Sequence, residues 1–96
     1  MNETINEQIG CWEKLKEKSG AVFWQTTHGS FEIIVSSLTT DPGKFGITIS
    51  QYKQKKFKGK IIGSAKNFKR AINFAEEWMN DHNSIKEVEK WAKSNL

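Results

Sequence analysis

The stretch from Phe31 to Ser50 constrains the fold most, because a strong turn signal separates two segments of alternating residues. In Asp41-Pro42-Gly43-Lys44, proline fixes φ at the second turn position and glycine permits a positive φ at the third. The flanking segments, Phe31–Leu38 and Phe45–Ser50, alternate apolar and polar residues as half-buried strands do. Ala21–Thr27 is rich in β-forming residues and precedes a turn at His28-Gly29. These segments predict three antiparallel strands.

Alternation also predicts which strand faces are buried. One face of 31–38 carries Phe31, Ile33 and Val35, and the other carries Glu32, Ile34 and Ser36. Phe23 and Trp24 face opposite sides of the first strand, which leaves open which of them is buried. Five other aromatic residues lie at helical spacings and are expected in the core: Trp12, Phe68, Phe74, Trp78 and Trp91.

Three segments predict helices beside this sheet. Thr4–Glu7 fits a capping box, and four apolar residues follow at helical spacing: Ile5, Ile9, Trp12 and Leu15. Gly20 then offers a left-handed cap. A second helix is expected from about residue 64 to 80, and a third over 84–95, opened by Ser84–Glu87. We therefore predict an α+β fold in one domain, residues 1–96. It would have a small three- to four-stranded antiparallel sheet with an N-terminal helix and two C-terminal helices packed on it.

The segment Pro42–Ala75 holds nine basic residues and no acid. The rest of the chain has six basic and 11 acidic residues, a balance of −5, so the total of +4 hides a segregated charge distribution. Within this segment, residues 52–60 fit three structures: an extension of the third strand, a hairpin turning at Gly59, or a flexible loop. Ile61-Ile62 then supplies a short fourth strand or an apolar anchor.

The helix expected at 64–80 carries its charges against its own dipole. Lys66, Lys69 and Arg70 lie in the first turns, where the dipole is positive, and the acids Glu76, Glu77 and Asp81 lie toward the negative end. Each misplaced charge is expected to cost roughly 0.3–1 kcal/mol unless an external anion compensates. Free N–H groups at a helix N-terminus suit such an anion.

Several other classes of function find no support in the sequence. No apolar run approaches the roughly 20 residues of a membrane-spanning helix, and a single cysteine, Cys11, fits a reducing, cytoplasmic location without disulfides. Cys11 flanks the apolar stripe of the expected first helix and is expected to be a buried thiol, without an argued base for a nucleophilic role. His28 and His82 lack metal-ligand spacing, so no metal or other cofactor is expected. No catalytic set is present, and we predict that the protein is not an enzyme.

The predicted order α-β-β-β-α with a basic start to the last of these helices resembles the double-stranded RNA-binding domain. Thr27-His28-Gly29 lies where that family has a histidine-bearing loop. Gly63-Ser64-Ala65-Lys66 with Lys69-Arg70-Ala71 is similar to the family's phosphate-gripping helix start. The family's lysine doublet is missing, the third-strand region is longer, and an extra helix follows. The resemblance implies recognition of A-form shape through phosphates and the minor groove, and a loop contact by His28.

The sequence therefore predicts a non-enzymatic nucleic-acid-binding protein, without indicating RNA or DNA, or single or double strands. Eight residues are expected to contact phosphates: Lys53, Lys55, Lys56, Lys58, Lys60, Lys66, Lys69 and Arg70. Tyr52 and Phe57 are candidates for stacking on bases. The alternative is a protein-interaction module or phage-type inhibitor that docks its basic surface on an acidic partner protein. Homodimerisation through the tryptophan-bearing helices is left open.

Overall fold

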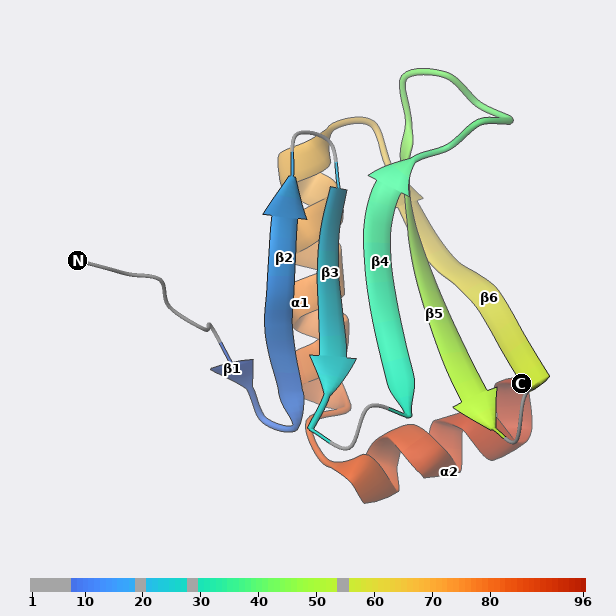
Figure 1. The fold of residues 1–96 in the computed structure, drawn as a ribbon. Coiled ribbons are helices and arrows are strands. Elements are labelled where there is room, and N and C mark those ends of the chain that lie inside the picture. The colour runs from blue at the N-terminus through green and yellow to red at the C-terminus, as the bar shows by residue number, and fades with distance from the viewer. Residues whose placement is uncertain (1–7, 19–20, 28–29, 54–55) are drawn as a thin grey trace.

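The computed structural model describes residues 8–18, 21–27, 30–53 and 56–96, with the backbone alone for residues 16, 18, 52, 53, 56 and 57. Its elements are β1 (Gln8–Ile9), β2 (Trp12–Lys18), β3 (Ala21–Thr26), β4 (Phe31–Ser37), β5 (Phe45–Lys53), β6 (Lys56–Ala65), α1 (Phe68–Asp81) and α2 (Ile85–Asn95). The strands form one sheet in the order β1-β2-β3-β4-β5-β6, each antiparallel to its neighbour. In Figure 1, α1 lies behind this sheet and α2 crosses its lower end, so the near face carries no helix.

The predicted N-terminal helix and three- to four-stranded sheet are wrong, because the first described residues form strands and the sheet has six. Gly10 turns the chain between β1 and β2 with φ 57°, a conformation that ends any helix. Trp12 is fully buried, but Leu15 falls at a register shift in β2 and is 49% exposed. The helical spacing of these residues was therefore a coincidence. Thr4–Glu7 and Gly20 lie outside the described residues.

The same finding removes the basis of the resemblance to the double-stranded RNA-binding domain. That resemblance needs a helix before the first long strand, and the chain instead forms β1 and β2 there. The histidine loop at residue 28 lies outside the described residues. Only the strands leading into a helix with a basic start remain in common.

The predictions for the central strands are confirmed. The observed β3 and β4 match the expected segments, and Phe31, Ile33 and Val35 are buried while the alternate residues are half-buried. At the β4–β5 turn, Gly43 has φ 92° and the Lys44 N–H donates to Asp41 O at 3.2 Å. Of the pair left open, Trp24 is buried and Phe23 lies on the opposite, helix-free face.

Residues 52–53 and 56–60 lie in two paired antiparallel strands, so the chain does not turn at Gly59. Strand β5 continues to Lys53, and β6 begins at Lys56, so Gly59 lies within β6 opposite Ser50. A register shift opposite Ile47 and Thr48 inserts one extra residue into β6. There Ile62 packs against the core, and Gly63 lies so close to α1 that an added Cβ would be 2.5 Å from Phe74 Cζ.

The core lies between the sheet and the two helices. The sheet contributes Trp12, Val22, Trp24, Phe31, Ile33, Val35, Ile47 and Ile49, and the helices contribute Ala71, Ala75, Met79, Val88 and Ala92. The expected start of α2 is confirmed, because Ser84 Oγ accepts the Glu87 N–H at 3.3 Å. The predicted packing role of Trp12 and Trp78 is also confirmed, since their rings meet edge to face at 6.1 Å.

The turn between β1 and β2 is fastened to the connection between α1 and α2. The Cys11 N–H donates to Asn83 O at 2.8 Å, and Trp12 Nε1 donates to His82 O at 2.9 Å. The His82 ring stacks on Trp78 with centroids 3.9 Å apart. These contacts attach the start of the sheet to the end of the helix that covers it, and we call residues 10–12 with 82–83 the clasp.

Candidate nucleic-acid interface

Strand β6 carries lysines along the outer edge of the sheet. Lys58 pairs in register with Gln51, and Lys60 with Ile49, so both lysines lie on the helix side of the strand. Both are exposed, and neither forms an ion pair with any described residue. Because β6 has a neighbour on one side only, its outer backbone groups also face away from the sheet. The edge therefore presents positive charge that the described part of the protein does not neutralise.

The start of α1 is a second basic site. Asn67 is the N-cap, and its side chain accepts the Arg70 N–H at 2.8 Å. The first turn contains no acid and the last turn contains no base, so the helix keeps the reversed charge order expected from the sequence. Lys66, Lys69 and Arg70 are all exposed. Lys44, by contrast, is paired with Asp41 at 3.2 Å.

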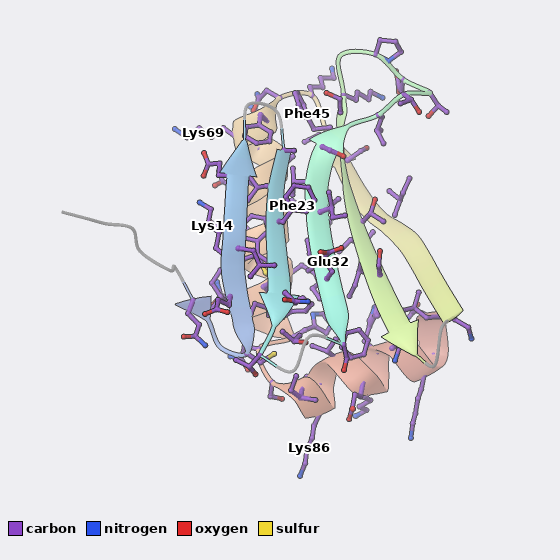
Figure 2. All side chains as sticks on the ribbon, in the orientation of Figure 1. Lys14, Phe23, Glu32, Phe45, Lys69 and Lys86 are labelled. Atoms are coloured by element: carbon purple, nitrogen blue, oxygen red, sulfur yellow. The ribbon has the colours of Figure 1, made fainter. Side chains whose placement is uncertain are left out.

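The structure divides the basic stretch instead of gathering it in one patch. The β5–β6 hairpin lies at the lower end of the sheet and α1 begins at the upper end (Figure 1). Lys58 and Lys66 are eight residues apart along an extended strand, roughly 25 Å at about 3.3 Å per residue. Figure 2 shows Lys69 beside the upper end of β2, across the molecule from β6. Lys66 directly follows the end of β6, whereas Lys69 lies within α1, away from that edge.

The two candidate stacking residues occupy a different face from the lysines. Tyr52 and Phe57 are cross-strand partners in the hairpin. Alternation places them at register positions of the helix-free face, while Lys56, Lys58 and Lys60 take the intervening positions of β6. Lys53 is opposite Lys56 in register. Lys55 and His28 lie outside the described residues.

The reversed charges of α1 give a direct test. Changing Lys69 to Glu is expected to raise Tm by a few degrees, because an acid then lies at the positive end of the helix dipole. The matched control is Lys93→Glu in the last turn of α2, which places an acid at a negative end and is expected to lower Tm. Thermal unfolding by circular dichroism at low and high salt measures both shifts, and salt should shrink them. A Tm lowered by Lys69→Glu would contradict the conclusion that the charges of α1 oppose its dipole.

The described residues give little support to a nucleophilic, metal-binding or membrane-spanning role. Burial raises the pKa of the half-buried Cys11 thiol, so the group stays protonated and a poor nucleophile. His82 Nδ1 lies 2.8 Å from Trp78 O, and its ring stacks on Trp78, an arrangement typical of packing. Within the described ranges, no three acidic, histidine or cysteine side chains are grouped to hold a metal. Neither described helix has the length and apolarity needed to cross a membrane.

Sequence reasoning missed a row of three apolar residues and one threonine on the helix-free face. The register aligns Phe23 with Ile34, Ile34 with Thr48, and Thr48 with Ile61, across four strands. Ile61 is 56% exposed, and we call these four residues the open-face row. One residue in the sequence indicated this row: Ile34 is apolar but shares its strand face with the polar residues Glu32 and Ser36. Aligning it with Phe23 and Ile61 required the strand register.

The chain matches no protein-family model, and neither a curated protein nor a solved structure shows significant similarity to it. The functional argument therefore depends on the chain's own residues.

Proposed function

We propose that this protein is a non-enzymatic nucleic-acid-binding protein that holds a nucleic-acid strand along β6. One observation carries the proposal: Lys58 and Lys60 of the outer strand are exposed and form no ion pair with a described residue, within a segment, Pro42–Ala75, that contains no acid. Neutralising acids are present elsewhere, as Lys14 with Glu17 at 2.7 Å shows. A cytoplasmic location, which the single cysteine fits, is part of this proposal.

The arrangement of the charges favours a long polyanion over a small anion. Lys58 and Lys60 lie near the hairpin, and Lys66 follows the opposite end of β6. A single phosphate or carboxylate can contact only one end of this strand. A nucleic-acid backbone repeats its charge at short intervals and can contact both ends at once. Backbone N–H groups on the free edge of β6 add hydrogen-bond donors for phosphate oxygens.

Removing two edge lysines tests the proposal. For Lys58→Gln/Lys60→Gln, we expect weaker binding and a slope of log K against log salt that is shallower by about 1.5–2, because two phosphate contacts are lost. The control is Lys86→Gln/Lys90→Gln, which removes the same charge from exposed positions of α2. Figure 2 shows Lys86 pointing away from the sheet. Fluorescence anisotropy with labelled single- and double-stranded DNA and RNA over a salt series gives both values.

The two pairs of variants separate a site from a general charge effect. Equal losses in both would mean that only net charge matters, and would contradict the β6 site. A further pair is Lys66→Gln against Lys69→Gln. We expect the larger loss for Lys66, because it directly follows the end of β6 whereas Lys69 lies beside β2. Absence of binding to any nucleic acid at low salt would reject the proposal. Recovery of one stoichiometric acidic protein after nuclease treatment would then support the protein-partner alternative.

A further inference from the structure

We propose that the strand bound at β6 is single-stranded and that its bases lie on the open-face row. This inference rests on the proposed function and specifies its ligand. The row of Phe23, Ile34, Thr48 and Ile61 crosses β3, β4, β5 and β6 on the face that carries no helix (Figure 1). At about 4.8 Å between strands, it spans roughly 15 Å. Tyr52 and Phe57 extend the same face at its hairpin end by register.

Strand β6 contributes both to the open-face row and to the edge lysines. Lys60 and Ile61 are consecutive, so they lie on opposite faces of one exposed edge strand. A nucleic-acid strand that follows this edge has phosphates within reach of Lys58 and Lys60, while bases turned inward reach Ile61 and then the rest of the row. Single-stranded binding commonly combines a basic track with apolar and aromatic surfaces for the bases.

The neighbouring positions on the open face favour this orientation. On one side of the row, the register aligns small residues: Ala21, Ser36, Gly46 and Ser64. The Leu38 side chain covers Gly46, where an added Cβ would lie 2.5 Å from Leu38 Cδ2, and it adds apolar surface beside the row. On the other side lie Glu13 and Glu32, aligned through Gln25. Their carboxylates repel phosphates, which keeps the nucleic-acid backbone at β6 and away from the middle of the sheet.

Two other occupants fit the face less well. A second copy packed face to face would bury Glu32 of both chains, and Glu32 has no ion-pair partner among the described residues to offset the loss of hydration. A duplex keeps its bases stacked inside the helix, so it cannot present them to a flat apolar row. Unstacked bases of a single strand can lie on it.

The test uses apolar residues on and off the row. With a fluorescein-labelled oligothymidylate, Phe23→Ser and Ile61→Ser are each expected to weaken binding about tenfold, because each removes a surface that contacts a base. Their salt slopes should match the wild type, because no charge is removed. Leu15→Ser is the matched control, since Leu15 is 49% exposed and Ile61 is 56% exposed. Circular dichroism confirms folding, and Ile34→Thr replaces Phe23→Ser if that variant unfolds.

The outcomes separate this inference from the proposed function. Tighter binding to the oligothymidylate than to a duplex of the same length supports it, provided that Phe23→Ser and Ile61→Ser weaken binding and Leu15→Ser does not. Wild-type affinity in the row variants together with sensitivity to Lys58→Gln/Lys60→Gln overturns it and leaves the β6 site intact. A wild-type dimer in light scattering that Ile61→Ser dissociates also overturns it, because the row is then a subunit interface. Insensitivity to the β6 lysines rejects both proposals.

Discussion

Replacing Gly10 with alanine is expected to lower the free energy of unfolding by about 3 kcal/mol. Its φ of 57° lies in the left-handed region, where a non-glycine residue costs roughly 1–2 kcal/mol. An added Cβ would also lie 2.2 Å from Asn83 O, so the clasp must open. Opening it breaks the Cys11 N–H and Trp12 Nε1 hydrogen bonds, each contributing about 0.5–1.5 kcal/mol. Urea unfolding monitored by tryptophan fluorescence measures the loss.

Gly43→Ala is the control for Gly10→Ala. Gly43 also has a positive φ, 92°, but an added Cβ would meet nothing within 4 Å. This variant should therefore show the backbone cost alone, about 1–2 kcal/mol. The difference between the two variants isolates the close approach to Asn83. Equal losses would show that the clasp adds nothing beyond backbone conformation.

Trp12→Phe is expected to cost about 3 kcal/mol, considerably more than Trp24→Phe. Both side chains are fully buried, so both substitutions lose apolar contact and leave a small cavity. Trp12 Nε1 also donates to His82 O at 2.9 Å, and its removal leaves that carbonyl without its donor. Trp24 Nε1 is buried and has no hydrogen-bond partner among the described residues. Such a buried donor costs roughly 1–3 kcal/mol, and phenylalanine removes this cost. We therefore expect only about 1 kcal/mol for Trp24→Phe.

Chemical denaturation of Trp12→Phe and Trp24→Phe measures the two losses of unfolding free energy. Both variants carry the same type of substitution, so the losses can be compared directly. A loss for Trp24→Phe equal to that for Trp12→Phe would show that cavity formation dominates both. Ser84→Ala is a control for these two variants, because it removes only the cap of α2 and leaves both tryptophans unchanged.

The sequence predicted the central strands because their faces differ in polarity. Alternation in β4 and the Asp-Pro-Gly-Lys turn specify local structure without reference to the rest of the chain. The N-terminal segment misled because Ile9, Trp12 and Leu15 satisfy a helical spacing. The register shift between Lys14 and Lys16 disturbs the alternation that would have indicated a strand. This segment also forms hydrogen bonds with Asn83 and His82, which are distant in the chain. Local sequence patterns cannot predict such contacts.

The candidate site was predictable in part. The lysines were evident from charge alone, and the reversed order of charges in α1 follows from the position of the helix. Their division between two ends of the sheet depends on the length of β6, which the sequence left open among three structures. The open-face row required the register of four strands, because Phe23 and Ile61 are far apart in the chain.

The clasp also has a kinetic meaning. Each strand pairs with its neighbour in the chain, so the sheet can assemble through successive hairpins with short loop closures. The Trp12–His82 hydrogen bond instead joins residues separated by 70 positions. Closing so long a loop costs chain entropy that is repaid only when the sheet and α1 already hold both ends nearby. We therefore expect the clasp to form late in folding, after the six-stranded sheet and α1 have assembled.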